Sequence, residues 1–174
     1  MTEKERDKPF ANPGNAIHLV RTTQQGHYTL SQMADQKASI LMGASFVIFA
    51  ITVGQARTGG GPPLPLVVLG GFAFFAAVFA VLAILPAVRT RRGGDVNLLF
   101  FGSFAQLERD DYIERVLAAL ATDESIYRTM AGDIYANGVV LARKKYRMLG
   151  YAYRIFLAGL TLSFLTFIAE PFWK

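Results

Sequence analysis

The sequence of 174 residues contains no cysteine, which excludes disulfides, thiolate metal sites and cysteine nucleophiles. It also lacks a G-x-S-x-G, an H-E-x-x-H and a P-loop pattern. The two histidines, His18 and His27, have no acidic neighbour that would complete a metal site. A membrane enzyme is therefore the lowest-ranked class of function, and we predict no catalytic residue, no metal and no resident cofactor.

Charged residues are also scarce. They make up 18% of the chain, against about a quarter of a soluble domain. Hydrophobic residues make up 52% and gather in three blocks, 38–54, 64–88 and 148–170. A helix needs about 17 to 25 apolar residues to cross a bilayer, so each block is long enough. The sequence therefore predicts an all-α integral membrane protein with three transmembrane helices.

Small residues in these spans predict close packing between the helices. The third span holds Gly159 and Ser163 four residues apart, and Arg154 near its start is expected to reach the interface with its long side chain. The second span carries a stripe of alanines: Ala73, Ala77, Ala80 and Ala83.

The net charge of +5 is interpreted as a sign of topology rather than of nucleic-acid binding, because no basic stripe alternates with aromatic residues. Basic residues flank the spans at Lys37, Arg89, Arg91, Arg92, Lys144, Lys145 and Arg147. With three spans all of them fall on one side, which predicts a cytoplasmic N-terminus and an extracytoplasmic C-terminus in the inner membrane. Residues up to Asp35 contain no apolar h-region, so we expect no signal peptide.

Three further segments complete the predicted organisation. Residues 1–14 form a disordered tail, and residues 15–37 form a cytoplasmic helix that leads into the membrane, with Asn15 as its N-cap. One face of that helix is mixed in polarity: Ile17, Val20, Gln24, His27 and Ser31. Residues 89–147 form a cytoplasmic helical region between the second and third spans.

The cytoplasmic region begins with the apolar stretch 97–107, which is too short to span a bilayer and is expected to pack against the membrane or under the helices. Residues 110–121 have the period of an amphipathic helix, with apolar positions at Ile113, Val116, Leu117 and Leu120. Asp123 is the predicted N-cap of the next helix.

Two charged clusters are candidates for function. Asp35 and Lys37 either form a solvated boundary with Lys37 snorkelling, or face inward and contact a ligand or a switch. The second cluster either anchors the chain at the inner interface or belongs to a cationic pocket for a phosphate, to which Arg89, Arg91 and Arg92 would contribute. Its members are Lys144, Lys145, Tyr146 and Arg147. In that pocket Tyr146 or Phe101 would stack on a base.

Three tracts of the sequence resemble the membrane effectors of Pycsar antiphage systems. They are ADQKASILMG from Ala34, NLLFFGSF from Asn97, and DIYANGVVLARKKYRMLGYAYRIFLAGL from Asp133. The resemblance covers the chain after about Asn15, and the tracts occur in the family's order. One departure is Glu108, which stands where family members often have a serine or threonine cap and leaves the start of that helix open.

The resemblance implies a role in bacterial defence. A partner cyclase would make cCMP or cUMP on infection, and this activating ligand would lead the effector to impair the inner membrane and cause abortive infection. By this resemblance, five positions within the tracts are candidate ligand contacts: Asp35, Lys37, Asn97, Lys145 and Tyr146. We expect a homo-oligomer in the lipid membrane. The alternative is a small membrane anchor or assembly subunit that binds a protein partner and no small ligand.

Overall fold

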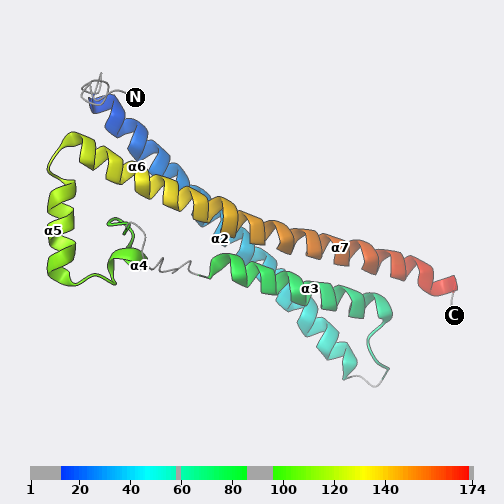
Figure 1. Ribbon diagram of the computed structural model, residues 1–174. Coiled ribbons are helices and arrows are strands. Elements are labelled where there is room, and N and C mark those ends of the chain that lie inside the picture. The colour runs from blue at the N-terminus through cyan, green and yellow to red at the C-terminus, as the bar shows by residue number, and fades with distance from the viewer. Residues whose placement is uncertain (1–12, 58–59, 86–95, 173–174) are drawn as a thin grey trace. The chain divides into compact units, whose positions relative to one another are not determined.

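The computed structural model describes residues 13–57, 60–85 and 96–172. Within these ranges every regular element is a helix, which confirms the all-α prediction (Figure 1). The elements are α2 (Pro13–Ala56), α3 (Leu64–Ile84), α4 (Phe101–Phe104), α5 (Arg109–Ala119), α6 (Asp123–Val140), the π-helix η1 (Leu141–Tyr146), α7 (Arg147–Ala169) and the 3₁₀ turn η2 (Glu170–Phe172).

Three of the described helical stretches are long and apolar enough to cross a membrane. They correspond to the three predicted spans. The predicted surface helix and the first span are parts of the one helix α2, which Gly26 does not interrupt. The predicted tail up to Asn12, together with Arg89, Arg91 and Arg92, lies outside the described residues.

The chain divides into two compact units, and two of the boundaries between them fall inside helices. Unit 1 comprises Met1–Thr29 and Val88–Gly138, and unit 2 comprises Leu30–Ala87 and Val139–Lys174. The boundaries therefore cut α2 after Thr29 and α6 after Gly138, and each unit is described separately below.

Unit 2 is built on α3, which packs along α7 in the antiparallel direction (Figure 1). Its core is small: Ala34, Ala38 and Leu41 of α2 pack with Ala80 and Ala83 of α3 and with Leu149 and Ala152 of α7. Alanines on all three helices let the backbones approach closely, which is how helices associate in lipid. The predicted stripe is confirmed at Ala73, Ala80 and Ala83, but Ala76 is fully buried there while Ala77 is only half-buried.

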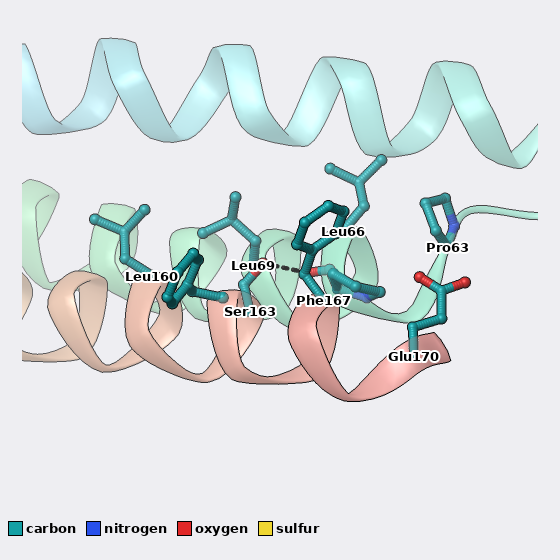
Figure 2. A pocket seen from close by; sticks show the side chains of 9 residues that line it. Pro63, Leu66, Leu69, Leu160, Ser163, Phe167 and Glu170 are labelled. Carbon is teal, nitrogen blue, oxygen red and sulfur yellow. Dashed lines mark hydrogen bonds between the residues drawn. The ribbon is translucent and has the colours of Figure 1, made fainter. Parts of the chain in front are cut away.

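The predicted pair of small residues on the third span also lies at the contact with α3. A methyl group added to Gly159 would stand 2.3 Å from Cβ of Phe72, and Ser163 donates a hydrogen bond to the carbonyl of Pro65 at 2.7 Å. Beside this bond lies an apolar groove of 420 Å³, and Figure 2 shows Leu66, Leu160 and Phe167 along it with Glu170 at one end.

In unit 1, α5 begins at Arg109, and Glu108 at its N-cap makes no side-chain cap hydrogen bond. The next helix, α6, is capped by Thr122 rather than by Asp123 as predicted. The Thr122 hydroxyl accepts a hydrogen bond from the backbone N–H of Ser125 at 3.2 Å, and the Ser125 hydroxyl accepts one from the backbone N–H of Thr122 at 3.1 Å. These reciprocal bonds satisfy two N–H groups.

The apolar face predicted for α5 remains largely uncovered within unit 1. Ile113, Leu117 and Leu120 are 38%, 62% and 58% exposed, and none of the described α5 residues is buried. Leu99 and Phe101 in the preceding stretch are also exposed, at 50% and 65%. The helices therefore leave these two residues of the 97–107 stretch largely uncovered, and packing of the stretch against the membrane stays a prediction.

Candidate functional site

The first candidate site is an ion pair in unit 2 that joins α2 to η1. The ammonium of Lys145 contacts both carboxylate oxygens of Asp35, at 2.8 and 2.7 Å, and donates to the hydroxyl of Ser31 at 2.7 Å. An ammonium has three donors, and these acceptors can use all of them. The Lys145 side chain is 18% exposed and that of Asp35 is 41% exposed, so solvent reaches the carboxylate more easily than the ammonium.

Two tyrosines that follow Lys145 in the sequence also bind this stretch of α2 through their hydroxyl groups. The Tyr146 hydroxyl donates to the carbonyl of Leu30 at 3.4 Å, and that of Tyr153 donates to the carbonyl of Lys37 at 3.2 Å. The Lys37 side chain is exposed and contacts none of these groups. The structure therefore brings Asp35, Lys145 and Tyr146 to one place and leaves the Lys37 ammonium outside it.

The position of Lys145 depends on an unusual backbone element. Residues Leu141–Tyr146 form a π-helix, and such widened turns often occur at functional sites. Because a π-turn holds more residues than an α-turn, it shifts the direction of the side chains that follow. The neighbouring Lys144 points to α3, where its ammonium donates to the carbonyl of Leu85 at 2.6 Å. Adjacent lysines thus contact two different helices.

The second candidate site is a polar cluster in unit 1 around Asp133, which is only 3% exposed. Its carboxylate accepts hydrogen bonds from the side-chain amides of Asn97 at 2.9 Å, Asn137 at 3.0 Å and Gln24 at 3.2 Å. No basic side chain among the described residues pairs with it. Three neutral donors therefore carry the stabilisation of this buried carboxylate.

Asn97 uses both ends of its amide. Its Nδ2 donates to Asp133, while its Oδ1 accepts the backbone N–H of Leu99 at 3.0 Å, which is the local bond of an Asx turn. The Asn97 backbone N–H donates to the hydroxyl of Ser103 at 3.0 Å. These bonds hold the Asn97–Phe104 stretch on α6, so Asn97 has a clear structural role.

His27 lies near this cluster on α2. Its imidazole packs on Gly138, where an added methyl group would stand 3.1 Å from Cε1. Its Nδ1 is buried without a hydrogen-bond partner among the described residues. His27 is therefore a packing residue here, and the described residues contain no group of three or more metal-ligating side chains.

Of the six predicted site residues, the structure places three in the ion-pair site and Asn97 in the Asp133 cluster. Phe101 is 65% exposed and contacts its neighbour Phe100. Sequence reasoning missed Asp133, Gln24 and Asn137 as one cluster. The cluster could have been suspected from the sequence, because Asp133 falls on the same helical face as Ile126 and Met130. A carboxylate on an apolar face is buried with it and therefore needs hydrogen-bond donors.

The three tracts singled out in the sequence thus contact one another in pairs. Asp35 of the first tract binds Lys145 of the third, and Asn97 of the second binds Asp133 of the third. The architecture is that of a helical membrane protein with three spans and a helical region between the second and third.

The particular family follows from comparison with known proteins. Residues 18–170 match the family model of the Pycsar effector protein domain, PycTM. The match covers nearly the whole chain, and the protein therefore belongs to this family of antiphage effectors. Neither the curated proteins nor the solved structures contain a match to it.

Proposed function

We propose that this Pycsar effector is activated by a cyclic pyrimidine mononucleotide, cCMP or cUMP, and then impairs the integrity of the inner membrane. The observation that supports the proposal is the Asp35–Lys145 ion pair. It is the least exposed ion pair among the described residues, it lies at a π-helix, and it joins two family tracts.

The proposed trigger is competition for the Lys145 ammonium. A cyclic mononucleotide carries one phosphodiester charge, and lysine is a common phosphate ligand. Because Asp35 and Ser31 can use all three donors of Lys145, a phosphate can bind there only by replacing one of them. Binding would therefore loosen the contact between α2 and η1. A ligand shifts an equilibrium only if it binds one state better, and displacement of Asp35 provides that difference.

Tyr146 is the proposed base contact. It follows Lys145 directly, and its hydroxyl makes only a long bond of 3.4 Å to the Leu30 carbonyl. Loss of such a bond costs little. The ring also packs against the core of unit 2, so it would stack on a pyrimidine only after the opening of the ion pair has moved η1 away from α2. Phe101, which is exposed in unit 1, remains a second proposed stacking residue.

The test is calorimetric titration of the purified protein with cCMP, cUMP and, as a control, cAMP. We expect one pyrimidine nucleotide to bind at micromolar concentration. Lys145→Met should weaken binding about tenfold or more, since a hydrogen bond to a charged group contributes about 1.5 to 3 kcal/mol. Lys37→Met removes the same charge from the same region and should leave the affinity within about twofold.

Two results would contradict the proposal. The first is an absence of binding to both pyrimidine nucleotides at micromolar concentrations. The second is equal weakening by Lys37→Met and Lys145→Met, which would mean that net charge rather than the ion-pair site attracts the ligand. Membrane damage is measured separately, as nucleotide-dependent release of a dye from vesicles that contain the protein.

The proposal includes a cytoplasmic N-terminus, an extracytoplasmic C-terminus and a multi-pass position in the inner membrane. The uneven distribution of lysine and arginine supports this orientation. Single cysteines introduced at Asn15 and Phe172, in a chain with none of its own, would test it in intact cells. An impermeant thiol reagent should modify the cysteine at position 172 and not the one at position 15.

Self-association is also part of the proposal. Gly43, Ala50 and Gly54 lie on the face of α2 opposite the buried Ala34 and Ala38 and are exposed in unit 2. Small residues on such a face allow close approach of another helix. Cross-linking in membranes should yield dimers or larger assemblies.

A second function, as an anchor or assembly subunit for a protein partner, is favoured by the exposed apolar residues Ile113, Leu117 and Leu120 of α5. An unpartnered apolar face of this kind is typical of an interaction surface. In that case a partner co-purifies in stoichiometric amount, Leu117→Asp abolishes its binding, and added nucleotide changes nothing.

A further inference from the structure

Two arginines of α7 lie on the side of the helix that faces away from the core of unit 2. Ala152 of α7 is buried in that core, whereas Arg147 and Arg154 are exposed. Seven residues separate the two arginines, so at about 100° per residue they project within about 20° of each other around the helix. The basic cluster that the sequence suggested is therefore divided, because Lys145 binds α2 while Arg147 faces outward.

The contacts between α7 and α2 place Arg154 close to the inner end of the spans. Ala152 packs in the core with Ala38, at the start of the first span, and the Tyr153 hydroxyl donates to the carbonyl of Lys37. Arg154 lies only about 3 Å beyond Ala152 along the helix axis, and long cationic side chains extend over such distances to the interface. Helical side chains also lean toward the N-terminus of their helix, which for α7 is this same end.

Tyr151 stands between the two arginines on the same side of α7. Its ring packs against that of Phe79 of α3 at 5.9 Å, and the residue is 42% exposed. Within the part of the chain that the structure describes, its hydroxyl makes no hydrogen bond. An aromatic ring with a polar tip is typical of a membrane interface. Two guanidinium groups and one hydroxyl are thus available there as hydrogen-bond donors.

Unit 2 offers no carboxylate to these arginines. It contains only two acidic residues, Asp35 and Glu170. Asp35 is paired with Lys145, and Glu170 follows the far end of α7, about 24 Å from Arg154 along the axis. No ion pair between described residues involves Arg147 or Arg154. At a membrane interface the nearest anions are the phosphates of lipid headgroups, to which basic residues are attracted.

The same side of α7 is apolar beyond Arg154. Ala158 and Leu165 continue the line of the arginines and are exposed. The hydroxyl of Thr161, between them, donates to the carbonyl of Leu157 in its own helix. A ligand that covers this surface therefore carries an anionic group at one end and hydrocarbon along the rest. That description fits a phospholipid and fits neither a free phosphate nor a nucleotide.

We propose that Arg147, Tyr151 and Arg154 bind the headgroup of an anionic phospholipid whose acyl chains lie along Ala158 and Leu165. Arginine forks bind phosphate oxygens with two parallel hydrogen bonds, and the tyrosine hydroxyl donates a further one. The leaflet follows from the proposed orientation and is the inner one. The site itself rests neither on that orientation nor on nucleotide binding.

The test is native mass spectrometry of the full-length protein in neutral detergent, with phosphatidylglycerol or phosphatidylethanolamine added at equal concentration. We expect phosphatidylglycerol to bind about tenfold more tightly. One arginine near a membrane surface corresponds to about fivefold in affinity for anionic lipid. Arg154→Gln should therefore weaken phosphatidylglycerol binding about fivefold, and the double variant with Arg147→Gln about twentyfold. Tyr151→Phe keeps the ring on Phe79 and should weaken it about threefold.

Arg57→Gln is the matched control, because it removes the same charge from the loop at the opposite end of the spans. It should leave phosphatidylglycerol binding within about twofold of wild type. Equal binding of the two lipids, or equal weakening by Arg57→Gln and Arg154→Gln, would overturn the inference. Positions 147 and 154 face away from the core, so both variants are expected to keep the wild-type melting temperature, which is the control for folding.

Two further titrations separate this site from a site for water-soluble phosphates. Inorganic phosphate at millimolar concentration should leave phosphatidylglycerol bound, and its displacement would overturn the assignment to a lipid. Lys145→Met should leave lipid binding within about twofold. A loss as large as that of Arg154→Gln would place lipid and nucleotide in one site and contradict the inference. Absence of nucleotide binding with lipid binding intact would refute the proposed function and leave this site standing.

Discussion

Asp133 in unit 1 and Asp35 in unit 2 are held in contrasting ways. Asp133 is 3% exposed and is bound by three neutral amides, whereas the Asp35 side chain is 41% exposed and is bound by an ammonium. A buried carboxylate cannot exchange its partners without exposing unpaired groups. A half-exposed carboxylate can take water in place of its cation. The comparison indicates that Asp133 maintains structure and that Asp35 is suited to switching.

The two units also differ in what surrounds these residues. In unit 2 the core consists mainly of alanines in close backbone contact. In unit 1, Asp133 is the only residue of α6 that is fully buried, and the apolar face of α5 stays open. Packing of small residues therefore holds unit 2, while a polar cluster joins the segments of unit 1.

The largest expected effect is that of Asp133→Ala. It leaves the amides of Gln24, Asn97 and Asn137 without their shared acceptor and should destabilise unit 1 by about 3 kcal/mol. Asp133→Asn keeps an acceptor for Asn97 and should cost about half as much. Hydrogen exchange of α6 measures both. Glu124→Ala, which removes an exposed pair with Arg128, is the control, and an equal effect there would refute the structural role of Asp133.

Gly159→Ala should rank second, with a loss of about 2 kcal/mol. The added methyl group would stand 2.3 Å from Cβ of Phe72, an atom fixed to its backbone, so α3 and α7 must separate. The melting temperature of the purified protein measures the effect. Gly71→Ala has open space and should leave stability unchanged or raise it by up to about 1 kcal/mol. Similar losses in both variants would contradict the close packing of unit 2.

Thr122→Ala should destabilise unit 1 by about 1 kcal/mol, because the N-cap hydroxyl that accepts from Ser125 is lost. Asp123→Ala keeps that bond and should cost only a few tenths of a kcal/mol through the helix dipole. Helicity at increasing denaturant concentration compares the two variants. A larger effect of Asp123→Ala would restore Asp123 as the cap.

The smallest effect on stability is expected from Asp35→Asn. A half-exposed ion pair contributes little after solvent screening, so the loss should be about 0.5 kcal/mol or less. The same change removes the competitor for Lys145 and should tighten or at least preserve nucleotide binding by calorimetry. A loss of stability as large as that of Asp133→Ala would remove the contrast between the two aspartates.

The pattern of hydrophobic blocks predicted the three spans, because a bilayer imposes a length and an apolarity that few other structures require. The family tracts likewise indicated Asp35, Lys37, Asn97, Lys145 and Tyr146 as residues of interest. The tracts alone did not predict which of these side chains contact one another. Lys145 and Asp35 lie far apart in the sequence, and the π-helix that directs Lys145 has no reliable local pattern.

The sequence by itself determined that this is a helical membrane protein, since composition and periodicity respond to the solvent around each segment. Its three tracts indicated the Pycsar effector family by resemblance, and the match of residues 18–170 to the family model confirmed it. Only the tertiary structure decided that Asn97 donates to Asp133, that Thr122 rather than Asp123 caps α6, and that Lys145 rather than Lys37 pairs with Asp35. Each of these depends on the register between segments distant in the chain. That register is set by the close fit of side chains such as Gly159 on Phe72 and Ser163 on Pro65, which no single segment encodes.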